Sequence, residues 1–152
     1  ALDLLDSLQL RLARVSDWND KIIAEFRSND GKVGGPFEGA HLLLLTTTGA
    51  KSGLARVSPM VYFGEGGGLF VIASKAGAPT HPAWFHNLVA NPQVSVEMAT
   101  ERGIDTFTGT AVPVTGERRD ALFASFSSRN PGFAQYQAKT DRVIPVVEIS
   151  RG

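Results

Sequence analysis

The chain has 152 residues, of which 43% are hydrophobic and 20% charged, and its formal net charge is zero. This length predicts a single domain over 1–152 with a hydrophobic core, made of an N-terminal part over 1–39 and a body over 40–152. A neutral chain has no overall field that attracts nucleic acid, so an anion site must be a local cluster of cations. The absence of cysteine excludes disulfides and cysteine nucleophiles, and it fits a reducing compartment such as the cytoplasm.

The N-terminal part is predicted to contain two amphipathic helices, over 2–15 and 17–28. One face of the second helix carries three apolar side chains: Trp18, Ile22 and Phe26. This face either packs on a core or closes as a lid over a pocket, and a helix of this kind can also contact a membrane surface. No apolar run approaches the roughly 20 residues that a transmembrane helix requires, and we see no signal-peptide pattern.

The body is predicted to be mainly strand. The expected strands span 42–48, 56–63, 69–74, 94–98, 104–114 and 143–149. Shorter helices are expected over 82–90, 117–127 and 133–140. Because strands and helices do not alternate regularly, we expect an α+β fold built on an antiparallel barrel rather than a doubly wound sheet. Pro59 predicts an edge or a bulge in its strand, and Gly109 predicts a bend of the kind that barrel closure needs.

Two loops carry features that favour an anionic ligand. In the loop of the first predicted hairpin, Lys51, Ser52 and Arg56 bring together two cations, a hydroxyl and free backbone N–H groups. The second loop, 75–82, leads into a helix whose N-terminal N–H groups point back toward the loop. A solvated hairpin tip explains the first loop equally well when that loop is taken alone. The two loops together suit a cofactor with a flat apolar ring and an anionic tail.

Several common catalytic arrangements are missing from the sequence. The three histidines, His41, His81 and His86, do not have the HExxH spacing, so we expect no metal site. There is no GxSxG or Walker sequence, and the glycine-rich run at 64–68 falls between strands rather than before a helix. The two anion-favouring loops therefore remain as the features of the sequence that indicate a binding site.

Three segments together resemble one protein family. They are LLLLTTTGAKSGLARVSPMVYF, VIASKAGAPTHPAWFHNLVANPQVSVE and GFAQYQAKTDRVIPVVEI, preceded by FRSNDGKVGGPFEG. In combination they are similar to the deazaflavin-dependent nitroreductases of actinobacteria, over about 18–149. The resemblance implies a split β-barrel related to flavin-binding oxidases and reductases. It also implies coenzyme F420, an 8-hydroxy-5-deazaflavin with a phospholactyl-oligoglutamate tail, as the cofactor.

The resemblance further implies which residues form the cofactor site. Lys51 and Arg56 are expected to face the phosphate, with Ser52 assisting. The residues expected to line the ring are Ser58, Pro59 and Val61. The residues expected to enclose the opposite edge and the tail are Ser74, Lys75, Gly77, Ala78 and Pro79. The site is expected to be completed from the following helix by Trp84 and Asn87.

The implied activity is that of an F420H2-dependent reductase. A 5-deazaflavin moves a hydride rather than single electrons, and the expected acceptors are activated alkenes, quinones and nitroaromatics. Tyr136 is the candidate that orients the substrate or donates a proton, with simple packing on the last strand as the alternative. Some relatives carry further tyrosines here, whereas this chain has Pro131 and Phe133, which favour an apolar substrate under the lid formed by Trp18, Ile22 and Phe26.

Other functions stay open on the sequence. A split-barrel oxidoreductase with FMN would be yellow as purified, and a non-catalytic carrier would bind the deazaflavin without passing on its hydride. A sheet-based interaction module would retain all flavins only weakly. For partners, we expect a small-molecule hydride acceptor, no nucleic acid and a monomer or weak dimer. We expect a cytoplasmic location, with peripheral membrane contact through the N-terminal helix left open.

Overall fold

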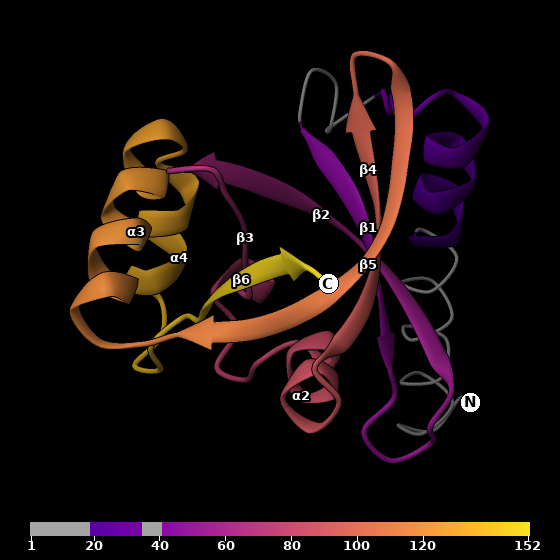
Figure 1. Cartoon of the computed structure of the whole chain (residues 1–152). Coiled ribbons are helices and arrows are strands. Elements are labelled where there is room, and N and C mark those ends of the chain that lie inside the picture. The colour runs from indigo at the N-terminus through magenta and orange to yellow at the C-terminus, as the bar shows by residue number, and fades with distance from the viewer. Residues whose placement is uncertain (1–18, 35–40) are drawn as a thin grey trace, which may run out of the picture.

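The computed structural model describes residues 19–34 and 41–152, whose strands form a closed antiparallel barrel (Figure 1). The order of strands around the barrel is β1-β2-β3-β6-β5-β4. Their bounds are β1 Leu42–Thr48, β2 Ala55–Glu65, β3 Gly68–Ile72, β4 Gln93–Thr100, β5 Gly103–Val114 and β6 Val146–Arg151. The predicted antiparallel barrel is confirmed, and the predicted bounds of β1 match the observed ones.

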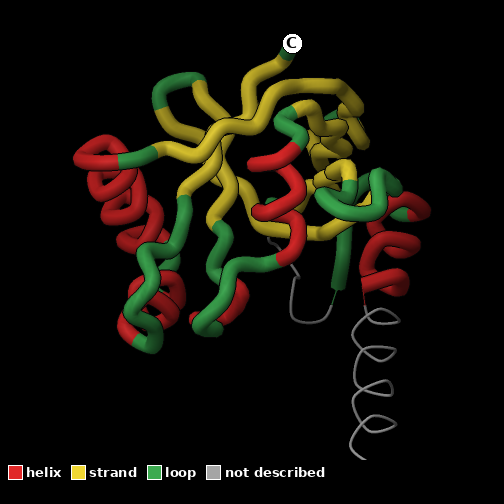
Figure 2. Tube along the Cα trace, turned by 90° about the horizontal axis from the view of Figure 1, so that it is seen from below, coloured by secondary structure: helices red, strands yellow, loops and turns green. Residues whose placement is uncertain are grey.

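Helices cover the sides and one end of this barrel. They are a helix over 19–28, the short η2 Lys75–Gly77, α2 Ala83–Ala90, α3 Gly116–Arg129 and α4 Gly132–Ala138. The helix over 19–28 and the α3–α4 pair lie on opposite sides of the barrel, and α2 crosses the strands in the view from below (Figures 1 and 2). Among the described residues, no helix is long and apolar enough to cross a membrane.

The long strand β5 closes the barrel by pairing with two different neighbours. Its first part pairs with β4 up to Thr110, and its second part pairs with β6 from Gly109 onward. At this change of partner the two backbones come very close, because a Cβ added to Gly109 would lie 2.4 Å from the carbonyl oxygen of Ser150. Only glycine permits that approach, which agrees with the bend predicted at Gly109.

Strand β2 is an edge strand in its first part. It pairs with β1 through a continuous register in which Pro59 faces Leu44. On its other side, β3 joins only from Tyr62 onward. Pro59 therefore has no ladder partner on one side, as its missing N–H requires, and the predicted edge is confirmed without a bulge.

The core consists of a barrel interior and two outer layers. Inside the barrel, leucines and valines of the strands pack with Leu88 of α2, while Trp84 and Phe85 lie at the edge of this cluster. On one outer side, α3 and α4 pack the phenylalanines Phe123, Phe126 and Phe133 against β2, β3 and β6. Because α2 fills part of the barrel end, its polar residues are held beside the β1–β2 hairpin.

Strand β6 begins later than predicted. The apolar run from Val143 predicts strand there, but the ladder starts only at Val146. The N–H of Ile144 instead donates to the side-chain Oε1 of Gln137 at 2.9 Å, and Pro145 has no N–H to give to a ladder. Ile144 is fully buried all the same. The apolar run thus marks burial from Ile144 onward, while Val143 is exposed, and the side chain of Gln137 accepts the N–H that a neighbouring strand would otherwise accept.

Candidate functional site

A cleft of about 720 Å³ lies between the β1–β2 hairpin and α2. Six of the predicted cofactor residues line it: Lys51, Ser52, Arg56, Ser58, Trp84 and Asn87. The wall also includes Val57 and His86, and none of the lining side chains is a carboxylate. The structure therefore brings residues from two distant segments into one cleft with positive charge and an apolar wall.

The hairpin loop presents its polar groups to this cleft. Hydrogen bonds across its neck join Gly49 N–H to Leu54 C=O at 2.8 Å and Gly53 N–H to Gly49 C=O at 2.9 Å. Among the described residues no hydrogen bond reaches the N–H groups of Lys51 and Ser52, so both are available to a ligand. Consecutive free N–H groups in a turn form a concave site for an anion.

The cations of the cleft are not neutralised by neighbouring acids. Lys51 and Arg56 are exposed, and within the part of the chain that the structure describes neither forms an ion pair. A cation without a carboxylate partner keeps its full attraction for a bound anion, although solvent and salt screen it. The cleft is thus suited to a phosphate or carboxylate.

Asn87 supports the hairpin from α2. Its side chain is 8% exposed, its Oδ1 accepts the N–H of Ala50 at 3.0 Å, and its Nδ2 donates to Thr47 Oγ1 at 3.1 Å. These bonds fix the position of the loop relative to α2, because buried polar groups need partners. A direct contact of Asn87 with a cofactor stays a prediction.

The second predicted loop does not line the cleft, and neither do Pro59 and Val61. The loop residues concerned are Ser74, Lys75, Gly77, Ala78 and Pro79. Part of this segment forms the short turn η2, which packs against α4, so that a Cβ on Gly77 would lie 2.8 Å from Tyr136 C=O. Lys75 Nζ donates to Thr80 Oγ1 at 3.1 Å and is otherwise exposed. The enclosing role of this loop stays a prediction.

The sequence did not indicate Arg142, which organises the second loop. Its guanidinium donates to three backbone carbonyls: Ala78 at 2.8 Å, Ser74 at 2.7 Å and Ala73 at 3.2 Å. It also lies 3.0 Å from His81 Nδ1. Burial lowers the pKa of Arg142. Nothing in the sequence around Arg142 indicates that its partners are the backbone carbonyls of a distant loop.

The contact with Arg142 determines which ring nitrogen of His81 carries the proton. An arginine always donates, so His81 Nδ1 must accept, and the ring proton stays on Nε2. Burial lowers the pKa of His81, and the charges of Arg142 and His86 lower it further. His81 is therefore held as a neutral imidazole.

Tyr136 lies on α4 at the border of the outer core. It packs beside that cluster together with Val61, one of the predicted ring-lining residues. Its ring meets Phe133 edge-on at 6.0 Å, and the ammonium of Lys139 lies 5.8 Å from its centroid. Both the packing role and the role toward a substrate are compatible with this half-buried position.

Two residues of the predicted lid are core residues. Ile22 and Phe26 are buried against Leu42 and Leu44 of β1. The sequence left two alternatives open for this face, packing on a core or closing as a lid, and the structure shows packing for Ile22 and Phe26. Trp18 lies outside the described residues. A contribution of this helix to a substrate pocket stays a prediction.

A second cleft, of about 680 Å³, is less suited to an anionic ligand. It is lined by residues that include Tyr62, Phe107, Glu148 and Arg151. Here Arg151 pairs with Asp105, and Glu148 is paired with Arg118 at 3.2 Å. Its charges are therefore already compensated. Among the described residues no group of acidic or histidine side chains could hold a metal ion.

Comparison with known proteins places the chain in a family. A family model described as F420H(2)-dependent quinone reductase matches residues 18–150. An F420H(2)-dependent quinone reductase of Mycobacterium tuberculosis (strain ATCC 25618 / H37Rv) is 37% identical over 132 residues, which are 84% of this chain and 86% of that protein.

Solved structures agree with this family. One described as an F420-H2 dependent reductase (FDR-A) is 41% identical, with a TM-score of 0.62 over 72% of this chain and 93% of its own. HutZ from Vibrio cholerae, at 21% identity and a TM-score of 0.56 over 88% of this chain and 90% of its own, shares the fold alone. The chain belongs to the F420H(2)-dependent quinone reductase family.

Proposed function

We propose that the protein reduces a quinone with a hydride from reduced coenzyme F420. The observation that carries this proposal is the cleft between the hairpin and α2, where Lys51 and Arg56 are unpaired among the described residues and no lining side chain is acidic. The family's description, F420H(2)-dependent quinone reductase, indicates F420H2 as the reductant and a quinone as the acceptor. A basic cleft with a tryptophan in its wall fits a cofactor that combines a flat ring with an anionic tail.

The residues present fit this cofactor. Lys51 and Arg56, with the free N–H groups of the hairpin loop, would hold the phosphate of the tail. Ser58, Pro59 and Val61 would line the ring, and the loop from Ser74 to Pro79 would enclose its other edge. When bound, F420H2 supplies a hydride from its C5 carbon. The contribution of the chain is to bind the cofactor, orient the quinone beside it and exclude water.

A direct test combines binding with turnover. We expect the protein to quench or shift the fluorescence of F420 on titration, and to oxidise F420H2 when menadione is added. FMN and NADPH serve as controls and should neither bind tightly nor support reduction. A protein that is yellow with FMN as purified would contradict the proposal. Tight binding of F420H2 without oxidation by any quinone would instead indicate a carrier.

Reduction of a quinone to a hydroquinone takes one proton beside the hydride, and we propose Tyr136 as the residue that donates this proton or orients the acceptor. Tyr136→Phe should lower kcat for menadione about tenfold or more, because general acid catalysis typically contributes about 10²–10⁴-fold. F420 affinity should stay unchanged. The chain has one other tyrosine, Tyr62, whose hydroxyl donates to Ala99 C=O at 3.1 Å. Tyr62→Phe is thus the matched control, and equal kinetics of both variants would leave Tyr136 a packing residue.

Activated alkenes and nitroaromatics are further proposed acceptors, since both accept a hydride at an electron-poor centre. The apolar environment that Phe133 provides near Tyr136 favours the less polar of these acceptors. A screen of cyclohexenone and a nitroaromatic beside menadione ranks these classes by kcat/KM. Turnover of menadione alone would restrict the activity to quinones.

A further inference from the structure

The turn η2 has a backbone that needs external support. Lys75, Ala76 and Gly77 all have positive φ, of 44°, 53° and 80°. The left-handed region is favourable for glycine but not for residues that carry a Cβ. Inside the turn, Gly77 N–H donates to Ser74 C=O at 2.9 Å and Ala78 N–H donates to Lys75 C=O at 3.0 Å. Two successive non-glycine residues in this conformation persist only where their surroundings fix them.

Arg142 supplies that support by binding both ends of the turn. Its guanidinium donates to Ala73 and Ser74 C=O before the turn and to Ala78 C=O after it, at 3.2, 2.7 and 2.8 Å. A planar guanidinium presents its donors in a fixed fork, so it can hold several carbonyls in one arrangement. The ammonium of a lysine has no such geometry.

The contacts of Arg142 favour a positioning role over direct binding of a ligand. Of the five N–H groups that an arginine has, four point to the three carbonyls and to His81 Nδ1. Little donor capacity is left for a ligand. Lys51 and Arg56, in contrast, are exposed and have no ion-pair partner among the described residues.

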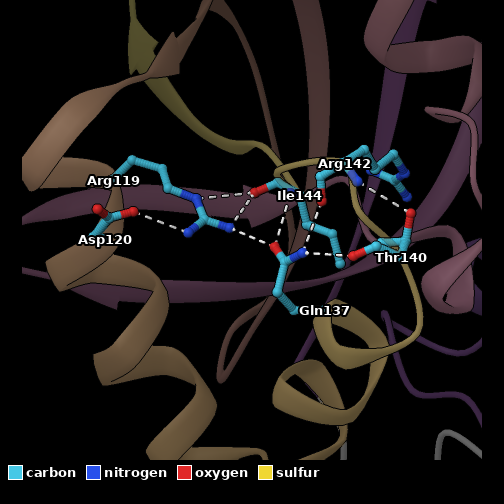
Figure 3. A network of polar contacts seen from close by, with 6 residues as sticks. All are labelled: Arg119, Asp120, Gln137, Thr140, Arg142 and Ile144. Carbon is cyan, nitrogen blue, oxygen red and sulfur yellow. Dashed lines mark hydrogen bonds and ion pairs between the residues drawn. The ribbon is translucent and has the colours of Figure 1, made fainter.

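Arg142 is itself held by α4. Gln137 Nε2 donates to Arg142 C=O at 2.7 Å, and Gln137 Oε1 accepts Arg119 Nη2 at 3.0 Å (Figure 3). Gln137 follows Tyr136 directly, and Gly77 packs on the backbone of Tyr136. The turn, Arg142 and the helix that carries Tyr136 are therefore joined by short contacts.

We propose that Arg142 is a positioning residue that preorganises the turn Lys75–Gly77 for the cofactor and fixes its distance from Tyr136. This inference rests on the proposed function, because the ligand that the turn encloses is F420. Preorganisation raises affinity by removing the cost of ordering a loop on binding. Loss of the guanidinium fork should therefore weaken F420 binding without removing any group that contacts F420.

The test compares Arg142→Lys and Arg142→Met with the control Arg129→Lys. Arg129 also donates to a backbone carbonyl, Gly64 C=O at 3.1 Å, but among the described residues none of its hydrogen bonds or ion pairs reaches the turn, Arg142 or Gln137. We expect amide hydrogen exchange at Gly77 and Ala78 to become about tenfold faster in both Arg142 variants, and the Kd for F420 to rise about tenfold. Arg129→Lys should leave exchange at the turn and the Kd unchanged.

Each outcome decides between the alternatives. Unchanged exchange at Gly77 and Ala78 would overturn the support of the turn by Arg142, and faster exchange with an unchanged Kd would overturn its role in binding. Wild-type behaviour of Arg142→Lys would show that charge, not the fork, matters. Equal losses in Arg129→Lys would show general destabilisation. If the unsubstituted protein fails to bind F420, the proposed function is wrong, while hydrogen exchange still tests the contact between Arg142 and the turn.

Discussion

The Lys51→Ala/Arg56→Ala variant is expected to bind F420 about 100-fold more weakly than the unsubstituted protein. A hydrogen bond to a charged group contributes about 1.5–3 kcal/mol. Both side chains are exposed, so we take the lower end of this range for each. Their sum corresponds to about two factors of ten in Kd. Fluorescence titration of F420 measures the change directly.

Removal of two positive charges also alters the net charge of the protein, so a matched control is needed. Lys32→Ala/Arg102→Ala removes one lysine and one arginine that are exposed and do not line the hairpin cleft. This control should keep the affinity of the unsubstituted protein. Increasing salt should weaken F420 binding in the unsubstituted protein and have less effect in the Lys51→Ala/Arg56→Ala variant, because exposed charges are screened. Equal affinities of the two double variants would contradict the site.

The hairpin site could be predicted because its chemistry is local. Lys51 and Ser52 lie in the hairpin turn and Arg56 follows at the start of β2, and the strands that position them have clear apolar and β-branched patterns. Trp84 and Asn87 were added by resemblance to a family, and the structure places both in the same cleft. Residue types that gather over a few positions thus indicate a site before the fold is known.

The supports of the site could not be predicted, because their partners are backbone atoms far away in the sequence. Arg142 binds carbonyls 64 to 69 residues away, and Asn87 accepts an N–H 37 residues away. Every residue has a backbone carbonyl, and every residue except proline has an N–H, so such a partner leaves no mark in the sequence. The later start of β6 also involves a backbone group, since the side chain of Gln137 accepts the N–H of Ile144 in place of a neighbouring strand.

Gly109→Ala is expected to lower the free energy of unfolding by about 3 kcal/mol. The new Cβ would lie 2.4 Å from Ser150 C=O and 3.2 Å from its carbonyl carbon, so β5 and β6 must move apart. Overpacking costs about 1–3 kcal/mol, and each hydrogen bond lost from the ladder adds about 1 kcal/mol. Urea unfolding followed by circular dichroism measures this difference.

Gly64→Ala provides the control for the change at Gly109. Gly64 also lies in a strand, its φ is not positive, and the nearest atom to a Cβ there is Gly68 C=O at 3.8 Å, an ordinary contact. This variant should change the free energy of unfolding by about 0.5 kcal/mol or less. If Gly109→Ala is as stable as Gly64→Ala, β5 and β6 do not meet as closely as described, and the change of partner along β5 does not require glycine. A barrel weakened at this junction should still retain the β1–β2 hairpin below its unfolding transition, because neither β1 nor β2 pairs with β5 or β6.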